Sequence, residues 1–370
     1  MKSLLLRCCA LFIALISPLN AAMLDQGTIN RVNDLRTIQS TNDQERIAGY
    51  NKKMDAAWKY FSQNKKVAIP ALQQILVEET ALRSPNQLVL LDVANFLARE
   101  GDSGSAVAVR GAFYRIDPAA DIIRDNFQDL FLLAHRLAGE HDPRMLTAFD
   151  RMFLATESSV FVPQHAMTLD GTLICVFLYG KSGAGTLPHL LELLKSPQPP
   201  LRVLEILVWL GNADIVPAIQ RTMKAHRDHE TFMRATAVMM TVGGKAGRDA
   251  MLSVKPDELQ PASKEYYGRV VGEIKETTYA RMEKSFAAMP GYKPMDDASL
   301  KTRLVKMRES YGKDDDLHPL AILKSGLPRD ELISELTRSR DRSFHRLSNE
   351  ALSDVKITNA LIKTLSLREK

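Results

Sequence analysis

Apolar segments that end in a glycine recur along the chain, and this repetition restricts its fold more than any other feature. The gaps between the glycines are 38, 41, 31 and 32 residues, and the positions are Gly101, Gly139, Gly180, Gly211 and Gly243. Such intervals match the length of one helical hairpin. Because the residue just past a helix end often adopts a positive φ, glycine is favoured there. The sequence therefore predicts successive two-helix units with corners at these glycines.

A second signal marks the other helix of each unit. The pattern apolar-Pro-x-apolar occurs at Ile69–Leu72, Leu187–Leu190 and Val216–Ile219. Proline is tolerated in the first turn of a helix, because its missing N–H has no intrahelical partner there. We therefore expect each of these segments to lie near the start of a helix. No segment shows a convincing strand-like alternation, so we expect no β-sheet.

The expected second helices carry an arginine nine residues before their glycine. Arg202 precedes Gly211 and Arg234 precedes Gly243 by that distance. Segment 201–210 is apolar at almost every position, which is typical of an interior helix covered by neighbours on several sides. Trp209, just before the glycine, is expected to pack in this core.

Together these patterns resemble the HEAT repeats of the armadillo-like helical superfamily. The likeness is best from Leu187 to Leu252 and extends back to Lys65. It implies an all-α protein, an α-α superhelix (solenoid) of helical hairpins whose second helices line a concave face. We expect one superhelical domain with an N-terminal helical cap at 23–64, HEAT-like repeats at 65–254, an irregular helical segment at 255–324 and C-terminal HEAT-like hairpins at 325–370.

The first 22 residues have the layout of a secretory signal peptide. Lys2 and Arg7 precede an apolar run at 10–16, and the small residues Ala21 and Ala22 follow it. That run is shorter than the roughly 20 residues needed to span a bilayer, and no later segment approaches this length. We therefore expect cleavage of 1–22 and a periplasmic or secreted protein without a membrane span.

Cleavage would leave Cys175 as the one remaining cysteine, in the apolar segment 173–178. A thiol in that setting is expected to be buried and unreactive. Stability must then come from core burial and not from disulfides. Of 49 Lys and Arg residues, two belong to the signal, so 47 remain against 44 Asp and Glu. This near balance argues against nucleic acid as a partner, because phosphate-backbone binding needs a concentrated basic surface.

Three polar residues stand out on otherwise apolar second helices: Arg202, Glu205 and Arg234. If second helices line the concave face, these side chains could contact a partner. Alternatively, each arginine bonds to carbonyls or acids of the adjacent unit, which is the more usual state of a buried arginine. They are the candidate partner-binding residues.

The densest polar cluster is 226–230. On a helix, His226 and His229 would share a face and could bind a metal together with Glu230. The alternative is a solvated turn between helices, which we favour because further ligands at helical spacing are missing nearby. The pair His229-Glu230 resembles one iron-binding step of HEAT-type lysine hydroxylases, but those enzymes need several steps. Bilin lyases built from helical repeats are similar in architecture, yet no catalytic residue carries over.

These observations predict a binding protein without catalytic residues, cofactor or metal. Stacked hairpins leave a long groove of varied side chains and no ready-made catalytic pocket. We expect the concave face to bind a protein partner or an extended ligand, so that the chain acts as a scaffold or accessory subunit. The alternative is an enzyme that uses the groove as its active site, either metal-dependent through His226, His229 and Glu230 or similar to a bilin lyase.

Overall fold

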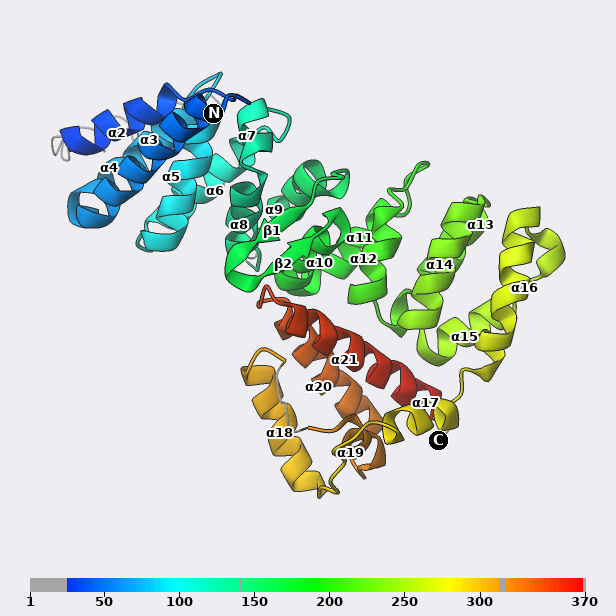
Figure 1. Cartoon of the computed structure of the whole chain (residues 1–370). Helices are drawn as coiled ribbons and strands as arrows, with labels where there is room; N and C mark the ends of the chain where they lie inside the picture. Colours follow the sequence, from blue (N-terminus) through cyan, green and yellow to red (C-terminus); the bar gives the residue numbers. More distant parts are fainter. Residues whose placement is uncertain (1–24, 140–141, 313–316, 369–370) are drawn as a thin grey trace, which may run out of the picture. The chain divides into compact units, whose positions relative to one another are not determined.

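The computed structural model describes residues 25–139, 142–312 and 317–368 (Figure 1). Helices hold 75% of the described residues and strands hold 2%, so the predicted all-helical class is confirmed. The predicted signal peptide, 1–22, lies outside the described residues. Within them, no helix is both long enough and apolar enough to cross a membrane.

The helices group into two compact units, whereas the sequence predicted a single superhelical domain. Unit 1 takes the described residues up to Leu137, and unit 2 takes those from Ala138 onward. The helices of unit 1 are α2 (Gln26–Arg36), α3 (Gln44–Gln63), α4 (Lys65–Ala81), α5 (Gln87–Glu100), α6 (Ser105–Arg115), α7 (Asp121–Asp125) and α8 (Phe127–Leu137).

Unit 2 begins with α9 (Pro143–Phe149), which runs into a π-helical turn at Asp150–Leu154. Short 3-10 turns lie at Pro163–His165, Gly183–Gly185, Ala213–Ile215 and Pro256–Glu258. Its strands are β1 (Val160–Val162) and β2 (Met167–Leu169). Its further helices are α10 (Gly171–Ser182), α11 (Thr186–Leu193), α12 (Arg202–Leu210), α13 (Val216–Ala225), α14 (His229–Thr241), α15 (Gly244–Leu252), α16 (Pro261–Glu276), α17 (Tyr279–Ala287), α18 (Asp297–Glu309), α19 (Pro319–Lys324), α20 (Arg329–Ser343) and α21 (Asn349–Leu367).

Helices in each unit pack largely in chain order. In unit 1, α4 contacts α5 and α6, and α5 contacts α8; in unit 2, α10, α12, α14 and α16 contact one another in succession. Side-chain caps fix where several of these helices begin. The Asn86 side chain accepts from Val89 N at 3.0 Å, and that of Asp170 accepts from Leu173 N at 2.9 Å. Each such bond satisfies a backbone donor that the first turn leaves unpaired.

A small β-hairpin contradicts the expectation that the chain lacks strands. β1 pairs antiparallel with β2, and Val160 lies opposite Leu169. Val160 and Val162 are buried, whereas Phe161 between them is 54% exposed. This is the alternation of a half-buried strand, but it lasts only three residues. The turn reaches positive φ at Ala166 and not at a glycine, so the usual sequence signal of a hairpin is missing.

The repeat glycines lie near helix ends, but the predicted reason for them is wrong at most positions. Gly101 and Gly211 directly follow α5 and α12, and Gly139 comes two residues after α8. Gly243 comes two residues after α14, and Gly180 lies inside the last turn of α10. Of these five, only Gly139 has a positive φ, at 94°. At Gly211 a Cβ would lie 2.6 Å from the Leu207 carbonyl oxygen, so close packing and not backbone conformation requires glycine.

The proline signal is confirmed at two of its three positions. Pro188 and Pro217 lie in the first turns of α11 and α13. Pro70 lies inside α4, which begins at Lys65, one turn earlier than the pattern predicted. Helix α3 ends at Gln63 and Asn64 separates the two helices, so α4 starts at this corner and not at its proline.

Gly211→Ala is expected to lower the free energy of unfolding of unit 2 by about 1–3 kcal/mol, a typical cost of overpacking. The added methyl would also lie 2.7 Å from Ile215 Cδ1 and 2.8 Å from Val242 Cγ2. Gly268→Ala is the matched control, because a Cβ there meets nothing within 4 Å and Gly268 is inside α16. Ala in place of an exposed helical Gly should stabilise by roughly 0.5–1 kcal/mol. Urea denaturation of both variants shows whether the free energy of unfolding falls in Gly211→Ala and rises in Gly268→Ala.

The C-terminal hairpin of α20 and α21 packs across the ends of earlier helices of unit 2. α21 contacts α12, α14 and α15, and α20 contacts α10 (Figure 1). The Phe344 ring lies against Gly180, where a Cβ would approach its Cδ2 to 2.5 Å. Helices α20 and α21 therefore return to the middle of unit 2 in addition to contacting their chain neighbours.

Polar side chains of this hairpin bind the carbonyl groups at those helix ends. Arg340, 4% exposed, donates from Nη1 to the Gly211 carbonyl oxygen at 2.7 Å and to Asn359 Oδ1 at 3.2 Å. Asn359 Nδ2 donates to the Trp209 carbonyl oxygen at 3.0 Å, and Lys363 Nζ donates to that of Met240. The last carbonyls of a helix lack intrahelical partners, so the hairpin supplies the donors that α12 and α14 need.

Candidate functional site

Arg202, the first of the sequence candidates, binds backbone carbonyls within unit 2. Its Nη1 donates to the Leu154 carbonyl oxygen at 3.1 Å and also to that of Thr156. These carbonyls lie at and just after the π-helical turn. Gly171 makes room for the guanidinium, because a Cβ there would lie 2.8 Å from Nη1. The residue thus joins the start of α12 to the segment that precedes the β-hairpin.

Glu205 and Arg234, the other two candidates, contact each other between α12 and α14. Glu205 Oε2 also accepts from Thr172 Oγ1 of α10 at 2.7 Å, and Arg234 Nη2 donates to Glu230 Oε1 at 2.6 Å. One polar network therefore links α10, α12 and α14. This is the pairing between neighbouring helical hairpins that the sequence offered as an alternative; partner contact by these side chains stays a prediction.

The cluster at 226–230 forms the turn between α13 and α14, so its two histidines do not share a helix face. His226 follows the last residue of α13, and His229 is the first residue of α14. His229 Nδ1 lies 3.3 Å from Ser263 Oγ. The Asp228 carboxylate caps α14 by accepting from Thr231 N at 2.8 Å, and this backbone bond is the largest cause lowering its pKa. Across 25–139, 142–312 and 317–368, no three His, Cys, Asp or Glu side chains are grouped to hold a metal.

Cys175 is fully buried in α10, as its apolar neighbours predicted. Burial raises the pKa of its thiol to about 12. A thiol with that pKa holds almost no thiolate at neutral pH, so Cys175 is unsuited to nucleophilic chemistry. Trp209, expected in the core, is only partly buried, and the Lys356 ammonium lies 5.3 Å from its ring centroid.

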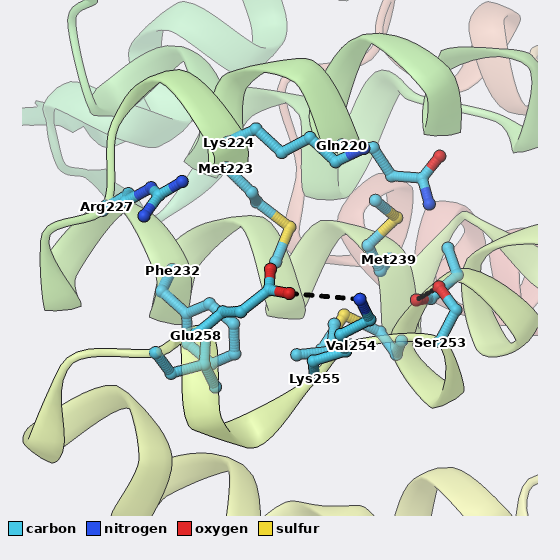
Figure 2. Close-up of a pocket in the computed structure, with 13 residues that line it drawn as sticks. Gln220, Met223, Lys224, Arg227, Phe232, Met239, Ser253, Val254, Lys255 and Glu258 are labelled. Atoms are coloured by element: carbon cyan, nitrogen blue, oxygen red, sulfur yellow. Dashed lines mark hydrogen bonds and ion pairs between the residues drawn. The ribbon is translucent and has the colours of Figure 1, made fainter.

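A pocket of about 290 Å³ lies beside this turn, between α13, α14, α15 and the segment that follows α15 (Figure 2). Its walls carry apolar side chains from three different helices, namely Met223 of α13, Phe232 and Met239 of α14, and Met251 of α15. Met239 and Met251 are 1% and 0% exposed, so they form its floor. Methionine is flexible and polarisable, and surfaces built from it adapt to ligands of different shape.

Close helix packing sets the position of this floor. Gly247 of α15 lies against the Met239 backbone, where a Cβ would come too close to the carbonyl oxygen. Tyr267 of α16 donates from its hydroxyl to the Met251 carbonyl oxygen at 3.1 Å, which ties the end of α15 to the next helix. The segment 253–259 then closes one side of the pocket.

The rim of the pocket is basic. Lys224, Arg227 and Lys255 are exposed and line it, together with the single carboxylate of Glu258. Lys255 Nζ lies 3.3 Å from Glu258 Oε1, the contact drawn in Figure 2. Both side chains are largely exposed, at 77% and 64%, so this ion pair is a weak one. Lys224 and Arg227 thus give the rim a net positive charge.

This combination suits binding more than catalysis. The floor offers van der Waals contacts to an apolar group, and the rim offers cationic hydrogen-bond donors to an anionic one. The sequence pointed to the neighbouring histidine turn but not to the pocket. Met223, Met239 and Met251 are far apart in the chain, and in sequence each reads as an ordinary core residue of an amphipathic helix.

Comparisons with known proteins found no match to this chain. No family model matches it, and neither the curated proteins nor the solved structures include a match.

Proposed function

We propose that this chain is a non-catalytic binding protein of the HEAT-like kind that its sequence resembles. In this proposal the hairpins form a solenoid, and the pocket on unit 2 holds an apolar side chain from an acidic segment of a partner protein. The chain-order packing of α10, α12, α14 and α16 supports the repeat architecture. The observation that carries the binding role is the methionine floor beneath a basic rim.

The chemistry of the pocket favours a peptide segment as its occupant. A volume of about 290 Å³ suits a few side chains, and the pocket lies next to the exposed α13–α14 turn. Rim cations such as Lys224 and Arg227 attract acidic residues and steer their approach, while the buried floor selects an apolar anchor. A scaffold or accessory subunit would use such a site to hold one extended segment of its partner.

We also propose that the protein acts outside the cytoplasm, as the N-terminal residues suggest. The mature protein isolated from its native cells should then begin at Ala22 or Met23. Intact-mass measurement tests this location, and a chain that retains Met1–Ala21 contradicts it.

Binding by the pocket is tested with three short labelled peptides. The first has a central leucine flanked by acidic residues, the second has lysines as flanks, and the third has serine in place of the leucine. Fluorescence anisotropy should rank the acidic leucine peptide first. Arg227→Glu should weaken its binding about tenfold, or 1.4 kcal/mol, by removing one rim attraction and adding a repulsion.

Arg221→Glu is the matched control, because Arg221 is an exposed cation of α13 that does not line the pocket. It carries the same change in net charge and should leave the affinity nearly unchanged. Met223→Glu, which places a carboxylate in the wall, should abolish binding of the acidic leucine peptide. Equal affinity for the acidic and lysine-flanked peptides, or equal losses in Arg221→Glu and Arg227→Glu, would show that the pocket does not select an acidic segment.

A further inference from the structure

A buried carboxylate in unit 1 lacks the partner that its burial requires. Asp92 of α5 is 5% exposed, and its Oδ1 accepts from Trp58 Nε1 of α3 at 2.7 Å. Its Oδ2 is fully buried and has no hydrogen-bond partner among the described residues. A buried carboxylate is normally paired with a cation or with several donors, because ionising it otherwise costs several kcal/mol.

A second carboxylate, that of Asp129 on α8, lies near the first. Its charge raises the pKa of Asp92 further, after the larger effect of burial, and burial also raises the pKa of Asp129 itself. No described lysine or arginine forms an ion pair with either group. Arg136 of α8 lies close enough for its charge to oppose the effect of burial on the pKa of Asp129, but its guanidinium donates to Asn95 Oδ1 at 2.8 Å. The site therefore holds two carboxylates against one nearby cation, which is bonded to neither of them.

Aromatic groups complete the surroundings of the two carboxylates. The Trp58 indole N–H donates to Asp92, and the Arg99 guanidinium lies 4.4 Å from the centroid of the indole ring. Tyr50 of α3 donates to Asn126 Oδ1 at 2.5 Å; burial raises its pKa, and the charges of Asp129 and Asp92 add to the rise. Arg99 already shows that the indole face attracts cations, but its side chain stays outside and is 48% exposed.

We propose that unit 1 binds the ammonium group of a lysine side chain from a bound segment, held between Asp92 and Asp129 beside Trp58. An ammonium is compact and brings three donors, which match one free oxygen of Asp92 and the carboxylate of Asp129. Two carboxylates alone supply too few ligands for Ca²⁺ or Mg²⁺, which take six or more oxygens. The site lies in a different unit from the methionine pocket, so a test of one site does not decide the other.

Trp58 is partly exposed and Arg99 is exposed. In this proposal the ammonium enters from their side, by rotation of these two side chains. The incoming ammonium displaces Arg99 from the indole, which alters the surroundings of the ring. Tryptophan emission should therefore report binding.

The chain has two tryptophans, so Trp209→Phe leaves Trp58 as the sole indole probe. In this background, titration with lysine blocked at both its α-amino and carboxyl groups should give a saturable change in Trp58 emission. n-Butylammonium, which has the alkylammonium group of lysine without the peptide groups, should give the same response more weakly. Sodium chloride at equal ionic strength controls for screening. Asp92→Asn should weaken the lysine response at least about tenfold, the loss expected for a charge-assisted hydrogen bond.

Two further variants complete the test. Asp129→Asn should also weaken the response, and Asp121→Asn, which alters an exposed carboxylate of α7, should leave it unchanged. Circular dichroism establishes that each variant is folded. A response that does not saturate, or that persists in both Asp92→Asn and Asp129→Asn, overturns the lysine site. A response to n-butylammonium alone would assign the site to small amines and overturn the role of a bound segment.

Discussion

Arg340→Met is expected to lower the free energy of unfolding of unit 2 by about 3–5 kcal/mol, since it removes a buried cation that two buried acceptors and the Asp341 carboxylate need. The Gly211 carbonyl and Asn359 Oδ1 would lose their guanidinium donor while they stay covered by α21. Methionine retains most of the aliphatic volume, so the loss reports hydrogen bonding more than cavity formation. α12 and α14 should become less protected together with α21.

Hydrogen exchange of peptides from α12, α14 and α21, measured by mass spectrometry along a urea series, gives this change for unit 2 by itself. Arg338→Met is the matched control, because Arg338 lies on the same helix, is 57% exposed and pairs with Glu335 at 2.7 Å. Its effect should stay within about 0.5 kcal/mol, the range of ordinary surface substitutions. An effect of Arg340→Met below about 1 kcal/mol would mean that water replaces the guanidinium, and that the hairpin does not stabilise the ends of α12 and α14.

The repeat pattern predicted local structure well because it depends on neighbours in the chain. The end of a helix at Gly211 and the start of a helix at Pro217 depend on residues within one or two turns. Such neighbours can be recognised directly in the sequence. The docking of α20 and α21 depends on contacts between residues more than a hundred positions apart, such as Arg340 with Gly211. Nothing in the spacing of the chain encodes that contact. The glycine was correctly singled out, yet its role came from packing.

The candidate sites were harder to predict for the same reason. Arg202, Glu205 and Arg234 attracted notice as polar residues on apolar helices, and all three turned out to bind groups within unit 2. The methionine pocket gives no such signal in the sequence, because Met223, Met239 and Met251 cannot be told from ordinary core residues of amphipathic helices. Asp92 lies in a segment whose residues from Leu88 to Leu97 are all buried, and a carboxylate inside an apolar helix was the one sequence signal for this site.

Asp92 should make the stability of unit 1 fall as pH rises. Burial raises the pKa of its carboxyl from 3.8 to about 7, with a smaller contribution from Asp129, while the Trp58 hydrogen bond opposes the rise. Tyr50 on α3 is close enough for the charge of Asp92 to act on it. Arg136 on α8 acts on Asp129, and Arg99 on α5 lies over the Trp58 ring. The folded state therefore holds a proton between about pH 4 and pH 7 that the unfolded state has lost. The contribution of Asp92 to the free energy of unfolding is therefore greatest below pH 4. By pH 8 up to about 4 kcal/mol of it is lost, because each unit of pKa shift corresponds to 1.36 kcal/mol.

Asp92→Asn removes this dependence because the amide is neutral at every pH and its oxygen can still accept from Trp58 Nε1. In the Trp209→Phe background, urea unfolding followed by Trp58 emission should find the variant close to the parent at pH 4 and about 2–4 kcal/mol more stable at pH 8. Asp121→Asn should follow the parent at both values, because its carboxylate is 69% exposed. A variant that is destabilised at pH 8 would show that the Asp92 carboxylate is ionised and paired in the native protein, since only then does loss of its charge remove a favourable interaction.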